Sequence, residues 1–221
     1  CRYLALLLVL VPAGDLGPGS YGPAWRAFPT SAVPKRRKGW SIAGSYDIDA
    51  FEPGQPFDQI THLIEQIKEL PHLRTHIVTP FIPQYLGRGE GKQQKVVVVP
   101  CHGFLHFLVD TRKEEMTLHH FQRSADTPCG LVFNMIQYAA LLMIVAQVTD
   151  YTPTELVYTI SDAHIFAIQE ESVDELLARR PRPFPTVTLN PNVTSVFDFS
   201  PADFTIEDYH PYPAMRIPTP V

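Results

Sequence analysis

The chain is poor in the residues from which disulfide frameworks, metal clusters and phosphate loops are built. It has three cysteines in 221 residues, without the repeated CxxC spacing of a zinc motif. Neither a disulfide framework nor a metal site is therefore expected, and a reducing compartment is favoured. We find no Gly-rich loop of the kind that holds a nucleotide phosphate, and no internal repeat.

Positive charge is also scarce. Eighteen Lys and Arg stand against 23 Asp and Glu, which gives a formal net charge of -5. This balance argues against a general nucleic-acid binder, but it allows one anionic ligand held by a few arginines. With 45% hydrophobic residues, the chain predicts a single globular domain over residues 1–221 with a full core.

Two segments of this domain differ in composition from the rest. The first, CRYLALLLVLVPAG, resembles a signal peptide, but its apolar run of about ten residues is too short to span a bilayer. We interpret it as the buried remnant of a truncated or divergent N-terminal part, and we expect no membrane association. Residues 34–56 mix a basic run at 35–38 with Gly, Pro and acidic residues, and they predict an exposed insertion.

The remaining patterns predict an α+β fold with a mixed sheet and a long buried helix. The spacing of apolar residues predicts helices over 57–70, 133–150 and 173–180. Runs of strand-forming residues predict strands over 76–82, 96–100 and 156–166, and short strands after 186. Two further runs on either side of a charged turn predict a hairpin of 104–110 with 116–124. The order favours antiparallel hairpins over a β-α-β alternation.

Cys101 is the first candidate for chemistry, because it precedes an apolar run in VPCHGFLHFLV. A thiolate is a strong nucleophile when positive charge lies nearby, and the alternative is a buried, inert cysteine. If both lie in a strand, His102 points to the opposite face, so it is not expected to act as a direct base.

Polar residues at two other points are further candidates. In FQRSAD, Arg123 and Ser124 could hold a phosphate, and the alternative is a surface salt-bridge cluster. In GLVFN, the amide of Asn134 offers a donor and an acceptor together, which suits one edge of a uracil ring, or it caps a helix. In SDAHIF, His164 ends a strand and is by itself typical of a structural histidine.

Taken in order, these segments resemble the classical folate-dependent thymidylate synthases, a family that includes pyrimidine nucleotide hydroxymethylases. The resemblance covers most of the chain and rests on six motifs, namely DLGPGSYGPAWRAF, FDQITHLIEQIKELPHLRTHIV, VPCHGFLHFLV, FQRSADTPCGLVFNMIQYAALLMIVAQVT, LVYTISDAHIF and FDFSPADFTIEDYHPYPAMRIPTPV. It implies a sheet-to-sheet homodimer and a cytoplasmic enzyme.

For the nucleotide, the resemblance implies that Cys101 attacks C6 of a uridine monophosphate, dUMP or UMP. Arg123 and Ser124 bind the phosphate, and Arg74 reaches the phosphate in the other subunit's site. Asn134 reads O4 and N3 of the pyrimidine; relatives that act on cytosine carry Asp there.

The resemblance implies further roles around these residues. His164 contacts the ribose, Gln122 and the residue at position 166 belong to the nucleotide site, and Tyr21 joins the water network that removes the C5 proton. The co-substrate is 5,10-methylenetetrahydrofolate, without a metal. Its contacts are Asp126 at the pterin, Gly130 and Phe133 in the pocket wall, and Val221 closing over it.

The chain departs from the family at several of these positions. Thr75 replaces the second of two arginines, Phe166 replaces the ribose tyrosine, and Ile168 and Gln169 replace an Asn-His pair. The family's N-terminal glutamate, tryptophans and arginine loop have no counterpart in residues 1–14. Three readings therefore stay open: methylation of dUMP, 5-hydroxymethylation of dUMP or UMP, and nucleotide binding without turnover.

Overall fold

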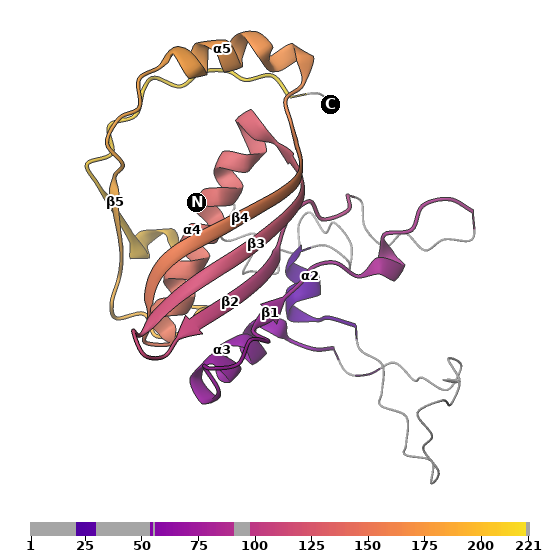
Figure 1. The fold of residues 1–221 in the computed structure, drawn as a ribbon, viewed down its shortest axis with the longest axis vertical. Helices are drawn as coiled ribbons and strands as arrows, with labels where there is room; N and C mark the ends of the chain where they lie inside the picture. Colours follow the sequence, from indigo (N-terminus) through magenta and orange to yellow (C-terminus); the bar gives the residue numbers. More distant parts are fainter. Residues whose placement is uncertain (1–20, 30–53, 55, 91–97, 220–221) are drawn as a thin grey trace.

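The structure is a computed structural model, and it describes residues 21–29, 54, 56–90 and 98–219 (Figure 1). Residues 1–20 and nearly all of the predicted insertion at 34–56 lie outside the described residues. The same holds for the first two residues of the predicted strand at 96–100, and its remaining part forms no strand.

A four-stranded mixed sheet in the order β1-β2-β3-β4 forms the frame of the molecule. Its strands are β1 (Ile77–Val78), β2 (Phe104–Asp110), β3 (Glu115–Asp126) and β4 (Thr152–His164). β2 and β3 form the predicted antiparallel hairpin, with Phe104 opposite Phe121. β1 is shorter than the predicted strand because Pro80 follows closely and has no N–H to donate.

The pairing of β3 with β4 corrects the sequence prediction. These strands are parallel, and the helix between them is a crossover connection, so the chain does contain a β-α-β unit. Parallel neighbours need a connection of about a dozen residues or more, and residues 127–151 supply it. The expectation of antiparallel hairpins alone was wrong, because the long apolar segment indicated a helix but not the two strands it joins.

The helices form where the sequence places helical spacing between breakers. They are α2 (Tyr21–Arg26), α3 (Gln59–Glu69), α4 (Val132–Val148) and α5 (Glu170–Ala178), with short helical turns η2 (Pro83–Tyr85), η3 (Thr127–Leu131), η4 (Ala167–Gln169) and η5 (Pro201–Asp203). α3 begins at an N-cap, since the Asp58 carboxylate accepts from the amides of Ile60 and Thr61 at 3.1 Å.

α4 lies against one face of the sheet and is buried in its second half only (Figure 1). Its first turns expose Val132, Phe133 and Ile136, whereas most residues from Gln137 to Val148 are buried. Residues Thr127–Val148 are long and apolar enough to cross a membrane by length and composition. Because the second half packs into the core, we interpret them as a core helix.

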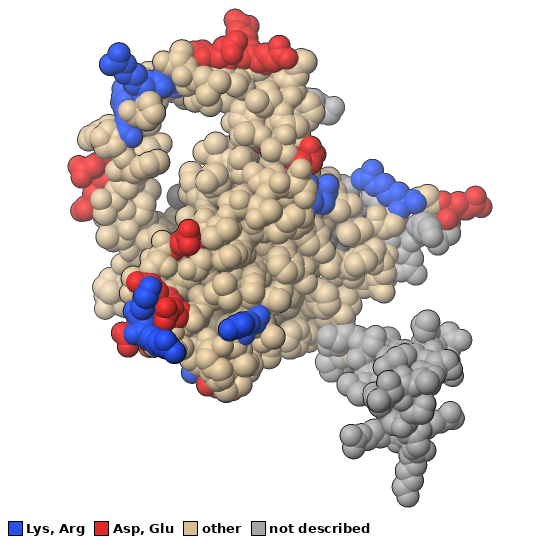
Figure 2. All heavy atoms as spheres, in the orientation of Figure 1, with Lys and Arg blue, Asp and Glu red and all other residues tan. Residues whose placement is uncertain are grey.

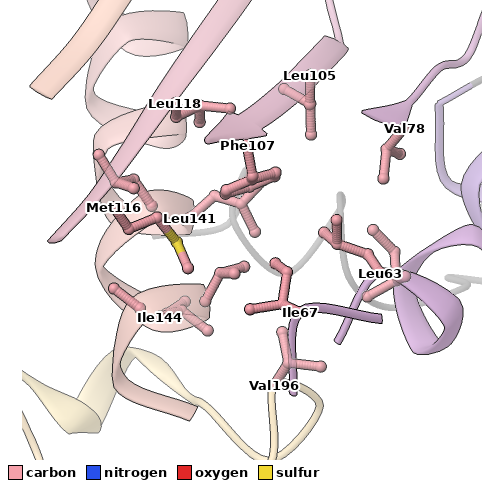
Figure 3. Close-up of a cluster of buried hydrophobic side chains, with 14 of the residues drawn as sticks. Leu63, Ile67, Val78, Leu105, Phe107, Met116, Leu118, Leu141, Ile144 and Val196 are labelled. Carbon is pink, nitrogen blue, oxygen red and sulfur yellow. The ribbon is translucent and has the colours of Figure 1, made fainter. Parts of the chain in front are cut away.

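The core fills the space between the sheet, α3 and α4 (Figure 3). Side chains of β3 alternate between its two faces, so Met116, Leu118, His120 and Gln122 all point inward. The first two belong to the apolar core. The next two carry polar groups into the same interior at the end of the strand nearest Cys101.

Beyond β4 the chain forms an arc outside the sheet (Figure 1). The arc contains α5 and a two-stranded antiparallel sheet of β5 (Thr186–Leu189) and β6 (Phe204–Glu207), which confirms the short strands predicted after 186. Acidic side chains gather over α5, and basic side chains follow it (Figure 2). Residues 211–219 run back along α5 (Figure 1). The arc contacts the rest of the molecule near α4.

Candidate active site

Cys101 sits in a tight loop before β2, and other elements hold its backbone from both sides. Its amide donates to the Tyr21 hydroxyl of α2 at 2.7 Å. Its carbonyl accepts from the amides of Arg123 and Ser124 of β3 at 2.8 and 3.4 Å. The expectation that Cys101 and His102 point to opposite faces of a strand does not apply, because both lie in the loop before β2. Their side chains nevertheless have different surroundings.

The Arg123 side chain encloses this loop. Its Nε donates to the carbonyl of Pro100 at 2.7 Å, and Nη2 donates to the carbonyl of Val99 at 2.9 Å. Nη2 also lies 3.4 Å from Cys101 Sγ. This contact places a guanidinium donor directly beside the sulfur. Arg123 forms no ion pair with a carboxylate of the described residues, so the salt-bridge reading of FQRSAD loses its support.

A chain of hydrogen bonds runs from β4 through the interior to His102. The Tyr158 hydroxyl donates to Gln122 Oε1, and Gln122 Nε2 donates to Asn134 Oδ1 at 3.1 Å. Asn134 Nδ2 lies 3.0 Å from His102 Nε2, and His102 Nδ1 lies 2.5 Å from the Tyr138 hydroxyl. This direction requires Nε2 of His102 to accept and Nδ1 to donate, so the imidazole is neutral. The chain fixes the orientation of the Asn134 amide.

Burial explains the protonation of these groups. It lowers the pKa of His102 to about 4, and together with the neighbouring His102 it lowers the pKa of His120 to about 3. The His120 ring stacks on Tyr138 with centroids 3.9 Å apart, and its Nε2 accepts from the amide of Gly103 at 3.0 Å. Burial likewise raises the pKa of Tyr21 to about 12. Both histidines and Tyr21 are therefore uncharged at neutral pH.

The parallel register of β3 and β4 brings the second polar segment beside the first. Ser124 pairs with Asp162, and Asp126 pairs with His164. The Ser124 hydroxyl donates to Asp162 Oδ2 at 2.9 Å, and His164 Nδ1 lies 3.3 Å from the same oxygen. Phe166 packs edge-on against His164, with centroids 4.9 Å apart.

The residues predicted for the folate lie around the start of α4. A side-chain atom added at Gly130 would come within 4.0 Å of Asp126 and 3.9 Å of Asn134, so these three positions are adjacent. Phe133 is 61% exposed and lines a mainly apolar groove of about 780 Å³ between α4 and the arc (Figure 2). A carboxylate beside an apolar groove of this size fits a folate, whose flat polar head adjoins an apolar ring.

One described residue of the prediction, Arg74, is not brought to this cluster. Arg74 is exposed in the loop between α3 and β1, and its carbonyl lies 3.0 Å from His106 Nε2. Val221 lies outside the described residues. In the part of the chain that the structure describes, no group of three His, Cys, Asp or Glu side chains is arranged to hold a metal ion.

Sequence reasoning missed several residues of the cluster. Tyr138 and Tyr158 hold the two ends of the hydrogen-bond chain, and Gln169 binds Asp126 from the far side. A signal existed for Tyr138, because it follows Asn134 by four residues and so shares its helix face. The pairing of Gln169 with Asp126 across 43 positions had no local signal.

Comparison with known families agrees with this arrangement. A family model described as Thymidylate synthase matches residues 9–221, which is nearly the whole chain. Enzymes of this type are methyltransferases that carry out folate-dependent one-carbon transfer to a uridylate, with methylenetetrahydrofolate as co-substrate. The residues around Cys101, Arg123, Asp126 and Asn134 and the match together lead to one conclusion: the chain belongs to the thymidylate synthase family.

Proposed function

We propose that the protein converts dUMP to dTMP, with 5,10-methylenetetrahydrofolate as the donor of the one-carbon unit. The observation that carries this proposal is the contact of Cys101 Sγ with Arg123 Nη2 at 3.4 Å, beside an Asn134 amide of fixed orientation. Together they offer a nucleophile and a group that selects the pyrimidine.

In the proposed reaction, Cys101 adds as a thiolate to C6 of the uracil ring. The electrons of the C5–C6 double bond move to C5, which bonds the one-carbon unit as the unit's bonds to the folate nitrogens break. Once C5 has lost its proton, hydride from the tetrahydrofolate completes the methyl group, Cys101 leaves C6 as a thiolate, and dihydrofolate is the second product. The Arg123 guanidinium, 3.4 Å from Cys101 Sγ, donates toward this sulfur. When C5 loses its proton, ordered water held by Tyr21 accepts it; the tyrosine itself stays protonated because burial raises its pKa to about 12.

The selection of uracil follows from the hydrogen-bond chain. Asn134 Oδ1 has a second lone pair, and Nδ2 has a second hydrogen, which is only weakly engaged by Gln137 at 3.5 Å. These match the N3–H donor and the O4 acceptor of uracil. Cytosine offers the opposite pattern at the same edge, and the Gln122 and His102 contacts oppose rotation of the amide.

Phosphate binding requires a rearrangement of Ser124. Its hydroxyl is bound to Asp162, so we propose that it turns to the phosphate while His164 keeps Asp162 in place. The proposal includes a cytoplasmic homodimer in which Arg74 supplies a further cation to the partner's site, and the exposure of Arg74 supports this.

Phe166 favours a second candidate, a uridylate hydroxymethylase. Its ring cannot donate to or accept from a sugar hydroxyl, and its contact with His164 is an aromatic one. The contact to the sugar therefore differs from that of the family, which brings UMP into consideration beside dUMP. The product carries a 5-hydroxymethyl group when water rather than hydride completes the reaction.

Mass spectrometry of the nucleotide product tests these candidates. The protein is incubated with 5,10-methylenetetrahydrofolate and, in parallel, dUMP, UMP or dCMP. A methyl gain on dUMP with formation of dihydrofolate supports the proposal, and a hydroxymethyl gain supports the second candidate. In the Cys101→Ser variant we expect turnover to fall by about 1000-fold or more. Absence of product from the folded protein overturns the catalytic role of Cys101 and leaves nucleotide binding without turnover.

A further inference from the structure

Gln169 is a fully buried polar side chain behind the folate side of the site. It ends η4, directly before α5, and has 0% exposed surface. A primary amide in such a position must find partners for two hydrogens and an oxygen, because burying unpaired polar groups is unfavourable. The partners it uses come from its own turn and from two distant parts of the chain.

The amide oxygen of Gln169 fixes its own turn, and the amide nitrogen reaches further. Oε1 accepts from the amide of Phe166 at 2.9 Å. Nε2 lies 3.1 Å from both carboxylate oxygens of Asp126 and 3.0 Å from the carbonyl of Pro218. One hydrogen thus points to the carboxylate and the other to the carbonyl, and Cys129 Sγ lies at 3.8 Å from the same nitrogen. A single side-chain nitrogen therefore joins Asp126 to the segment 211–219.

The other side-chain bonds to this segment lie nearer the surface. Arg179 Nη1 donates to the carbonyl of Pro213 at 3.1 Å, Arg182 Nη1 to that of Pro211 at 3.0 Å, and Ser172 Oγ to that of Arg216 at 3.3 Å. These donors are exposed or half-buried, and water can replace them. Gln169 is different, because water cannot replace the Nε2 contacts without entering a closed site.

From this geometry we infer that Gln169 is a positioning residue that couples the docking of the segment 211–219 to the orientation of the Asp126 carboxylate. The inference rests on the proposed function, together with the folate contact that the resemblance implies for Asp126. When the segment is docked, Gln169 Nε2 lies 3.1 Å from both carboxylate oxygens and restrains rotation of the carboxylate. When the segment leaves, one hydrogen of Gln169 loses its acceptor, and the restraint on Asp126 weakens.

Coupling of this kind has a measurable consequence. Binding of the folate by an oriented Asp126 stabilises the docked segment, and a docked segment in turn favours folate binding, because linkage between two events is reciprocal. Among the described residues, Gln169 forms no hydrogen bond with Cys101 or Arg123 on the nucleotide side of the site, so that side should respond less.

The test replaces the donor while keeping the shape. In Gln169→Glu the oxygen that bonds Phe166 remains, but an oxygen replaces Nε2 and faces both Asp126 and the Pro218 carbonyl. Gln147→Glu is the matched control, since Gln147 Nε2 also holds two carbonyls, those of Asn190 and Val193 at 3.0 and 2.9 Å, far along α4. Gln169→Met, which adds no charge, serves if Gln169→Glu does not fold.

Two readouts are compared in these proteins. Hydrogen exchange of residues 211–219, measured without folate, should become about 10-fold faster or more in the Gln169 variants and stay near wild type in Gln147→Glu. The KM for 5,10-methylenetetrahydrofolate should rise by about 10-fold to 100-fold, with less than about a 3-fold change in the KM for the nucleotide.

The outcomes separate the inference from the proposed function. Unchanged hydrogen exchange in residues 211–219 of the Gln169 variants, or equal increases in both KM values, overturns the inference. The proposed function is unaffected by that result as long as the wild-type protein turns over dUMP. If the wild type shows no turnover, the proposed function fails, and the exchange experiment with tetrahydrofolate added still decides the coupling. In that case protection of 211–219 by the folate in the wild type but not in the Gln169 variants supports it, and equal protection overturns it.

Discussion

Acid should unfold this protein chiefly through His102 and His120, because burial lowers their pKa values to about 4 and about 3. In the folded state burial lowers the pKa of His102 to about 4 and that of His120 to about 3, from an ordinary value of 6.5. In the unfolded chain both imidazoles regain the ordinary value. Between pH 6.5 and about 4, the unfolded state therefore binds more protons than the folded state, so stability falls as the pH falls through this window.

The magnitude follows from the size of the window. At pH 5 the unfolded histidines lie about 1.5 units below their pKa, while the folded ones remain neutral. Each histidine then contributes a loss of about 2 kcal/mol relative to pH 7.5, at 1.36 kcal/mol for each unit. The sum of about 4 kcal/mol is a large part of the stability of a typical domain, about 5–15 kcal/mol.

Urea unfolding followed by circular dichroism at pH 7.5 and pH 5 measures this loss. His120→Gln keeps an acceptor for the amide of Gly103, which His120 accepts at 3.0 Å, but it removes the titrating group. We expect its pH-dependent loss to be smaller than that of the wild type by about 2 kcal/mol. His119→Gln, which removes an exposed imidazole from the next position of β3, is the matched control. Equal losses in the wild type and His120→Gln would refute the reasoning.

Two further substitutions test the loop and the pyrimidine contact. Gly103→Ala should cost about 2–4 kcal/mol in urea unfolding, because φ is +105° and the added carbon meets Pro80 and Trp25 at 3.1 Å; a cost below about 0.5 kcal/mol contradicts the tight packing. Asn134→Asp, which replaces a donor with an acceptor beside His102, should lower kcat/KM for dUMP by about 100-fold and raise it for dCMP. An unchanged ratio of dUMP to dCMP turnover argues against Asn134 as the selecting residue.

Local patterns predicted the parts of the fold that local forces determine. The helix α3 was predictable because its apolar spacing lies between the Asp58 cap and Pro71. The β2–β3 hairpin was predictable because two strand-forming runs flank the charged turn at 111–115. In each case the residues that decide the structure are within a few positions of one another.

The pairing of β3 with β4 could not be predicted in the same way. The pairing is determined by the position at which the chain re-enters the sheet after α4. That position follows from which half of this almost wholly apolar helix packs into the core. An apolar run without a polar face does not indicate its own orientation. The contact of Ser124 with Asp162 and that of Asp126 with Gln169 follow from this pairing and from η4, so they had no signal in the sequence either.

The site itself was predicted through chemistry rather than through geometry. The residue types around Cys101, Arg123 and Asn134 indicated a nucleophile, an anion site and a pyrimidine edge, and the structure brings these three residues to one place. The contacts of His102 with Asn134 and Tyr138 had no signal in the residues next to it, because they join the loop before β2 to α4. The roles that the family implies for individual residues stay predictions until turnover is measured.

The inward face of β3 explains why stability and activity are connected in this protein. Met116 and Leu118 build the apolar core, and His120 and Gln122 continue the same row toward Asn134 and Cys101. The polar groups of the site are therefore desolvated by the same packing that stabilises the fold, which keeps the histidines neutral and the amides in fixed orientations. Mutations that loosen this packing should allow the Asn134 amide to rotate before they unfold the chain. In a series of such mutants, selectivity for uracil over cytosine should therefore decrease before the protein unfolds.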